Sequence, residues 1–148
     1  MVVRIALGQL ESGADIQANL VAIDRFAAKA ARDGAALIAF PEYATYEKKK
    51  VDATFPAVAE PLDGPVCTEL AAVARRHRIG LVAGVVETSD EAGRAYNTLV
   101  AYGRDGGRLA IYRKIHLFDA QGLGSQRSSS PARPLTRWCS STGECGSG

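Results

Sequence analysis

The sequence is poor in cysteine and has no long apolar segment. Its 148 residues contain three cysteines, too few for a disulfide framework in a chain of this length. No apolar run approaches the ~20 residues that a membrane-spanning helix needs. Residues 1–10 include Arg4 and Gln9, which is typical of a strand rather than of a secretory signal. From these absences we expect a cytoplasmic protein with no membrane partner.

An excess of charge of one sign is also lacking. The formal net charge is only +2, and the excess lies after Ala120, where three arginines stand against one glutamate. The preceding residues are neutral overall, which argues against a nucleic-acid-binding surface. Neither histidine is near Cys139 or Cys145, so these cysteines do not indicate a zinc site. Hydrophobic residues make up 47% of the chain, enough for one domain with a core.

Strand and helix patterns alternate along residues 1–120. Helices are predicted after Asp15 and from Pro65, and Gly34 suits the left-handed position past the first helix. Residues 45–60 indicate a loop or a short helix. Strands are predicted over residues 2–10, 35–40, 79–87, 96–102 and 108–114. The first two strands should be parallel because a helix connects them, whereas a short hairpin joins the last two. The sequence therefore predicts an α/β domain with a mixed sheet and flanking helices.

Glu42 follows the most apolar of these segments. Residues 35–40 form an unbroken apolar run, which a strand buried on both faces requires. Pro41 lacks a backbone donor and should end sheet pairing there. Glu42 would then lie at the carboxyl end of a central strand, where α/β sheets bind ligands, and is a candidate general base. On position alone, the interpretation that Glu42 only begins a solvated loop is slightly favoured.

Lys114 ends the last predicted strand. It shares one face with Ala110 and Tyr112, because side chains alternate along a strand. A pair formed by Glu42 and Lys114 could be no more than a salt bridge, which contributes little to stability. It also suits chemistry, because the carboxylate can accept a proton and the ammonium can stabilise an oxyanion.

Several segments, taken in order, resemble the carbon–nitrogen hydrolase (nitrilase) superfamily. They are residues 3–10, Phe40-Pro41-Glu42, residues 80–84, Tyr96-Asn97-Thr98 and residues 112–119. The resemblance extends over residues 2 to about 120. It implies the α-β-β-α sandwich of the nitrilase type, present here in part. It also implies a Glu-Lys-Cys triad that acts on an amide or a nitrile without a metal or organic cofactor.

By this resemblance, Glu42 is the general base and Lys114 stabilises the tetrahedral intermediate. His116 is a neighbour of Lys114 without a catalytic role. Family members are mostly homo-oligomers that act on small molecules. Residues 1–120 would be the N-terminal portion of the hydrolase domain.

The nucleophile departs from the family pattern. The family cysteine lies at a strand-to-helix elbow well after the lysine, and neither Cys139 nor Cys145 has such a context. Cys67 precedes Lys114 in a predicted helix and is interpreted as a buried hydrophobe. Residues 121–148, rich in Ser, Gly, Pro and Arg, are predicted to be a disordered or out-of-frame tail.

Three functions are therefore weighed: an amide- or nitrile-cleaving hydrolase that lacks its cysteine and is inactive as given, a non-catalytic half-domain that acts only by association with another chain, and a nucleotide-binding domain. The third is the weakest because no glycine-rich phosphate loop is present.

Overall fold

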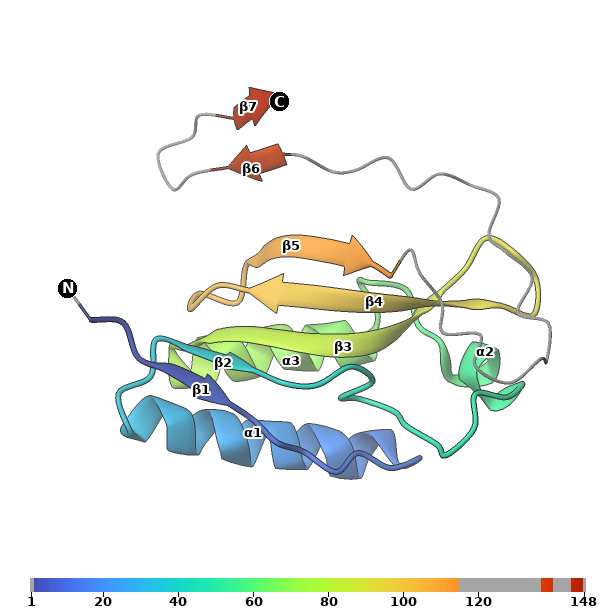
Figure 1. The fold of residues 1–148 in the computed structure, drawn as a ribbon, viewed down its shortest axis with the longest axis horizontal. Coiled ribbons are helices and arrows are strands. Elements are labelled where there is room, and N and C mark those ends of the chain that lie inside the picture. Colours follow the sequence, from blue (N-terminus) through green and yellow to red (C-terminus); the bar gives the residue numbers. More distant parts are fainter. Residues whose placement is uncertain (1, 115–136, 140–144, 148) are drawn as a thin grey trace. The chain divides into compact units, whose positions relative to one another are not determined.

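The structure is a computed structural model that describes residues 2–114, 137–139 and 145–147. It divides into two compact units, Met1–Lys114 and Ile115–Gly148. The first unit holds a five-stranded sheet in the order β1-β2-β3-β4-β5. Its elements, in chain order, are β1 (Ile5–Leu7), α1 (Ile16–Arg32), β2 (Leu37–Ala39), α2 (Thr54–Val58), α3 (Pro65–His77), β3 (Gly80–Thr88), β4 (Ala95–Tyr102) and β5 (Arg108–Arg113) (Figure 1).

The sheet is mixed, as the sequence predicts. Strands β1, β2 and β3 run parallel to one another. Strand β4 pairs antiparallel with β3, and β5 pairs antiparallel with β4. The parallel pairs are joined through α1 and α3, whereas short turns connect the antiparallel strands. This arrangement brings the carboxyl end of β2 and the carboxyl end of β5 to the same end of the sheet.

The helix boundaries follow from capping. Asp15 accepts a hydrogen bond from the backbone nitrogen of Ala18 (3.0 Å), which satisfies one of the free donors of the first turn of α1. Gly34, at φ 78°, follows the end of that helix in the left-handed region, as predicted. Helix α3 begins at Pro65 and ends at His77, and its C-cap residue, Arg78, has a φ of 52°, which is unusual for a residue with a side chain.

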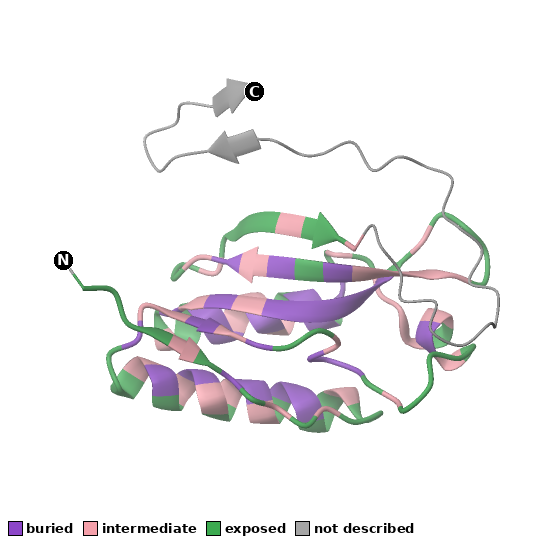
Figure 2. Ribbon diagram, in the orientation of Figure 1, coloured by how far each residue is buried: buried purple, intermediate pink, exposed green. Residues whose placement is uncertain are grey.

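The core lies between α1, α3 and one face of the sheet (Figure 2). Both helices direct an apolar stripe toward the sheet, and the strands contribute every second residue. The largest fully buried side chains of this core are Ile23, Ile38, Leu70, Val73, Ile79, Leu81 and Val100. The core therefore occupies one side of the sheet and fixes the strands on which the candidate site is built.

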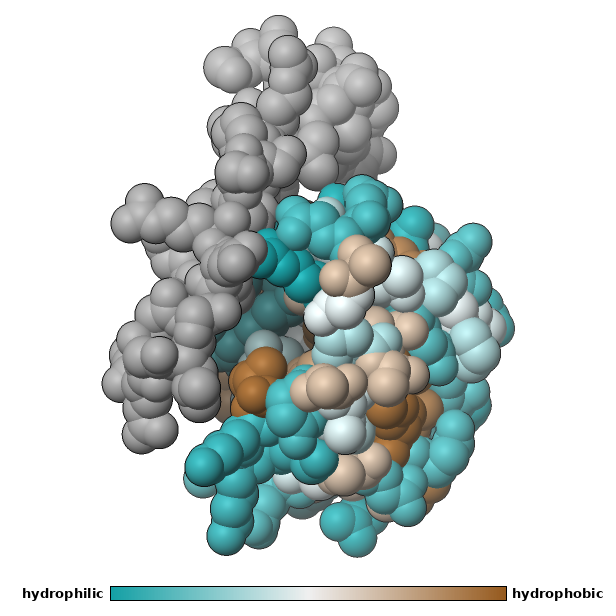
Figure 3. Space-filling view, turned by 90° about the vertical axis from the view of Figure 1, so that its right-hand side faces the viewer, coloured by the Kyte–Doolittle hydropathy of each residue, from teal (hydrophilic) through white to brown (hydrophobic). Residues whose placement is uncertain are grey.

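The opposite face of the sheet is apolar, and among the described residues of the first unit much of it is left exposed. Leu7 is 83% exposed, Ile5 is 56%, Tyr112 is 54% and Leu99 is 39%. This open face comprises eight residues that alternate along their strands with the core residues: Ile5, Leu7, Leu37, Ala39, Val82, Leu99, Ala101 and Tyr112. The end of the molecule that carries α2 shows a mainly hydrophilic surface with apolar residues gathered near its middle (Figure 3).

One expectation about β2 needs correction. The apolar run predicts a strand buried on both faces, but within β2 only Ile38 is buried, at 1% exposure, while Leu37 and Ala39 are partly exposed. The reason is that α1 and α3 cover only one face of the sheet. The apolar run therefore fits a strand that needs a second covering layer.

In the second unit, the structure describes two short strands. β6 (Arg137–Cys139) and β7 (Cys145–Ser147) pair antiparallel, with Cys139 opposite Cys145. His116 and most of the predicted tail, residues 121–148, lie outside the described residues, so the tail's character stays a prediction.

Candidate active site

The backbone after β2 runs alongside β3 and then turns at Glu42. The backbone nitrogen of Phe40 donates to the carbonyl of Val82 (2.8 Å), and that of Gly84 donates to the carbonyl of Pro41 (3.3 Å). Pro41 therefore keeps its acceptor in the sheet although it has no donor to contribute. These contacts hold Glu42 at the carboxyl end of the parallel strands, where the sequence predicts it.

Glu42 and Lys114 meet at this end of the sheet. The Lys114 ammonium donates from Nζ to Oε1 of Glu42 at 2.8 Å, although the two residues are 72 positions apart. Asn97 of β4 donates from Nδ2 to the same oxygen at 2.5 Å. The backbone nitrogen of Lys114 also donates to the carbonyl of Asn97 (2.8 Å), which extends the β4–β5 ladder by one residue. The structure thus brings together the two predicted site residues.

The contact between Glu42 and Lys114 favours the charged form of both residues. The hydrogen bond from Lys114 lowers the pKa of Glu42, with a further contribution from Asn97, while burial opposes the change. The same bond raises the pKa of Lys114. Half of the Glu42 side chain and 32% of the Lys114 side chain are exposed, so water screens the pair. At neutral pH both groups are therefore charged, and Glu42 is in the unprotonated form that a general base requires.

Gly84 permits the close approach of the Glu42 backbone. A Cβ at this position would lie 2.6 Å from the backbone nitrogen of Tyr43 and 2.9 Å from the Cα of Glu42. Both atoms belong to the backbone and cannot move aside cheaply. Tyr43 itself has φ 56°, in the left-handed region that residues with a side chain rarely adopt. The turn that presents Glu42 therefore depends on a missing side chain in β3.

Replacing Gly84 by alanine is expected to destabilise the fold by about 1–3 kcal/mol, the usual cost of overpacking. Gly13→Ala is the matched control, because a Cβ at Gly13 would have no neighbour within 4 Å and its φ is not positive. Chemical unfolding of both variants measures the difference. Equal unfolding midpoints for the two would contradict the proposed role of Gly84.

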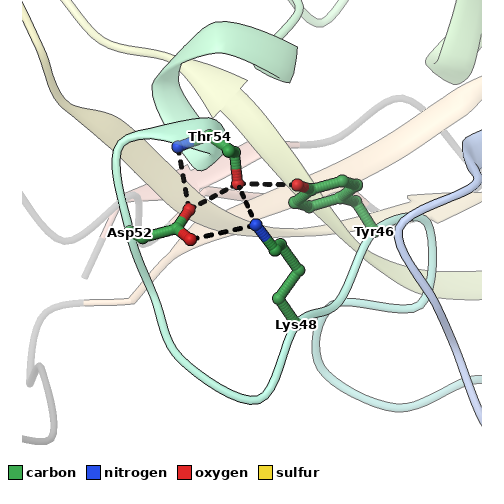
Figure 4. A network of polar contacts seen from close by, with 4 residues as sticks. All are labelled: Tyr46, Lys48, Asp52 and Thr54. Carbon is green, nitrogen blue, oxygen red and sulfur yellow. Dashed lines mark hydrogen bonds and ion pairs between the residues drawn. The ribbon is translucent and has the colours of Figure 1, made fainter.

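A second cluster fixes the chain that follows Glu42. The Phe55 ring of α2 packs edge-on against Tyr43 (5.2 Å between centroids) and Tyr46 (5.0 Å). The Tyr46 hydroxyl is 2.7 Å from Thr54 Oγ1, and Lys48 donates to both Thr54 and Asp52 (Figure 4). The Thr54 and Lys48 hydrogen bonds lower the pKa of Asp52 to about 2. These contacts close the loop between β2 and α2 beside the site.

Among the described side chains, no cysteine lies beside Glu42 and Lys114. Cys67 is buried in α3 within the core, on the helix-covered side of the sheet, and burial raises the pKa of its thiol. The side chains of Cys139 and Cys145 lie outside the described residues. Within the described parts of the chain, no three acidic, histidine or cysteine side chains group to hold a metal ion.

Asn97 is the site residue that the sequence reasoning missed. It stands in one of the segments that carry the family resemblance, but the sequence pattern alone predicts no role for it. A signal was available, because asparagine is disfavoured in strands and this one lies between strand formers. What the sequence could not show is that Asn97 and Lys114 are neighbours in the ladder and donate to one oxygen.

Comparison with known proteins points to one family. A family model described as carbon-nitrogen hydrolase matches residues 4–145. The hydrolase Rv0480c of Mycobacterium tuberculosis is 38% identical over 132 residues, which are 88% of this chain and 46% of that protein. The human omega-amidase NIT2 is 37% identical over 116 residues, 78% of this chain and 41% of that protein.

Solved structures agree with these matches. The amidase from Nesterenkonia sp. superposes with a TM-score of 0.69 at 29% identity, over 78% of this chain and 44% of that one. A variant of the amidase from Nesterenkonia sp. AN1 is described as showing covalent addition of the acetamide moiety of fluoroacetamide at the active site cysteine. These neighbours are nitrilase-superfamily proteins of the α-β-β-α fold, which confirms the predicted fold class.

The chain spans less than half the length of the relatives it matches. Among the described helices, none is long and apolar enough to cross a bilayer.

Proposed function

This chain belongs to the carbon–nitrogen hydrolase family, and we propose that it carries the acid–base half of an amide- or nitrile-cleaving active site. The observation that carries the proposal is the 2.8 Å contact between Lys114 Nζ and Glu42 Oε1 at the carboxyl end of β2. Glu42 is the general base, Lys114 stabilises the oxyanion, and the nucleophile is a cysteine thiol that the described residues do not supply.

The chemistry follows from the placement of the donors. Lys114 and Asn97 both donate to Oε1 of Glu42, and no described side chain donates to Oε2. That oxygen is the one that would take the thiol proton as sulfur attacks the carbonyl carbon. The ammonium of Lys114 would then donate to the oxygen on which negative charge develops. Collapse of the intermediate expels ammonia or an amine with the proton from Glu42, and water cleaves the thioester to the acid.

The substrate class is part of the same proposal. One relative is named an omega-amidase, and a structural neighbour carries an acetamide group on its cysteine, which supports a small amide over a peptide. We also propose a cytoplasmic protein that forms homo-oligomers in its intact form and needs no nucleic acid or membrane partner.

A second candidate function is favoured by the open face. A non-catalytic half-domain that acts only by association with another chain would present such a face. Leu7 and Tyr112, both more than half exposed, lie on it. Under this reading the Glu42–Lys114 pair is structural.

A chimera separates the two candidates. Residues 1–114 would replace the matching part of the amidase from Nesterenkonia sp., which supplies the remaining strands and the active-site cysteine. We expect the chimera to release ammonia from small aliphatic amides. A folded chimera without turnover, tested beside the unmodified amidase, would favour the non-catalytic reading.

The 148-residue chain is expected to release no ammonia above the rate in buffer. Cys67 is buried away from the site, and neither Cys139 nor Cys145 has the sequence context of the family nucleophile. A coupled ammonia assay on acetamide and propionamide measures this. Turnover that survives replacement of Cys139 and Cys145, yet depends on Glu42, would overturn the prediction.

A further inference from the structure

A second ion pair lies directly behind the first, on the other side of the sheet. Arg113 precedes Lys114, so the two side chains leave β5 in opposite directions. Arg113 Nε donates to Oε2 of Glu87 at 2.8 Å, and its terminal nitrogen donates to Oε1 at 2.5 Å. This bidentate arrangement fixes the orientation of the guanidinium as well as its distance from the carboxylate.

Glu87 is held from more than one side. Only 5% of its side chain is exposed, and Thr98 Oγ1 donates to its Oε2 at 2.7 Å. The Arg113 guanidinium also lies over the Tyr96 ring, 4.6 Å from the centroid. The pair thus joins β3, β4 and β5 at the end of the sheet that carries the candidate site.

The position of this pair in the ladder gives it a specific role. Thr98 is opposite Arg113 in the β4–β5 register, and the next two residues along are Asn97 and Lys114, which both bind Glu42. Among the described strands of the first unit, β5 is at the edge of the sheet, and the last described backbone bond of the β4–β5 ladder runs from Lys114 to Asn97. A side-chain anchor at this point of the strand would limit its local opening.

We propose that Glu87 and Arg113 are positioning residues that hold the end of β5 so that the Lys114 ammonium stays on Glu42. The pair lies on the opposite face of the sheet from Glu42 and Lys114 and takes no part in the chemistry proposed above. The proposal rests on the proposed function only in taking Lys114 as the residue that must be positioned. An arginine is required because a lysine cannot form two parallel hydrogen bonds to one carboxylate.

Competitive acetylation of the lysine amines, read by peptide mass spectrometry on the 148-residue chain, tests this. The Glu42 contact suppresses the reactivity of Lys114, and each unit by which the pKa of Lys114 falls raises its labelling about tenfold. Lys29, on α1, serves as the internal reference. The Glu42→Gln variant shows how strongly Lys114 is labelled when it has no carboxylate partner.

The test variant is Glu87→Gln combined with Arg113→Met, which avoids leaving a buried charge without its partner. We expect Lys114 labelling to rise toward the Glu42→Gln level, while Lys29 does not change. Arg76→Met is the matched control, because Arg76 pairs with Asp24 and Glu69 on the helices. It should lower stability without changing Lys114.

Circular dichroism establishes that each variant is folded. If the double variant melts earlier but leaves Lys114 labelling at the wild-type level, the pair is only structural and the proposal is overturned. If the double variant does not fold, Lys114 labelling is measured in Arg113→Lys instead. Labelling at the wild-type level in that variant also overturns the proposal. If Glu42→Gln itself leaves Lys114 unchanged, the ion pair of the proposed function fails as well, so the two failures are distinguishable.

Discussion

Glu42→Gln is expected to lower kcat of the amidase chimera by about 10²–10⁴-fold, the range that loss of a general base produces. The amide keeps the shape of the carboxylate and can still accept from Lys114 and Asn97. It cannot take up the thiol proton. The loss should therefore appear in kcat with little change in KM. Steady-state ammonia release measures both constants.

Two further variants make this prediction specific. Lys114→Met should cost about 10²–10³-fold, as loss of an oxyanion donor does. Glu47→Gln, at an exposed glutamate on the same loop, should leave kcat unchanged. A Glu42→Gln chimera that retains more than a tenth of the activity would show that Glu42 is not the base.

The pH dependence has a definite sign. Because Lys114 and Asn97 lower the pKa of Glu42 in the folded chain, the pair contributes stability above the ordinary carboxyl pKa. That contribution is lost as pH falls through the lowered pKa of Glu42. A layer that covers the site would remove water and raise this pKa again, which would make Glu42 a stronger base.

The second large effect concerns the open face. We expect the 148-residue chain to associate, because a contiguous apolar surface of this kind is seldom left exposed on a monomer. Leu7→Lys combined with Leu99→Lys should weaken association at least tenfold. Burial of one leucine contributes about 1.5–3 kcal/mol, and each 1.4 kcal/mol is about a tenfold change in Kd. Size-exclusion chromatography with light scattering measures the change.

Val21→Lys is the control for this experiment. Val21 is 70% exposed, as apolar as the leucines, and lies on α1 on the other side of the molecule. It should leave association unchanged. A wild-type chain that is monomeric and unfolds cooperatively would contradict the prediction, and so would a Val21 variant that dissociates as readily as the double variant.

Local patterns account for much of the fold. Capping by Asp15, the glycine after α1 and the proline that opens α3 are each governed by a few neighbouring residues, and the structure confirms all three. The burial of β2 could not be predicted in this way. Leu37 and Ala39 have the composition of a doubly covered strand, and whether a covering layer is present depends on residues far from them in sequence.

The sequence by itself determined which residues end the strands, and with them the candidates Glu42 and Lys114, because proline placement and side-chain alternation are local rules. Only the tertiary structure decided that the two meet at 2.8 Å, that Asn97 shares the same carboxylate oxygen, and that Arg113 and Glu87 stand behind them. The physical reason is that strand order and register place residues up to 72 positions apart within hydrogen-bonding distance, and no local pattern records which strands become neighbours.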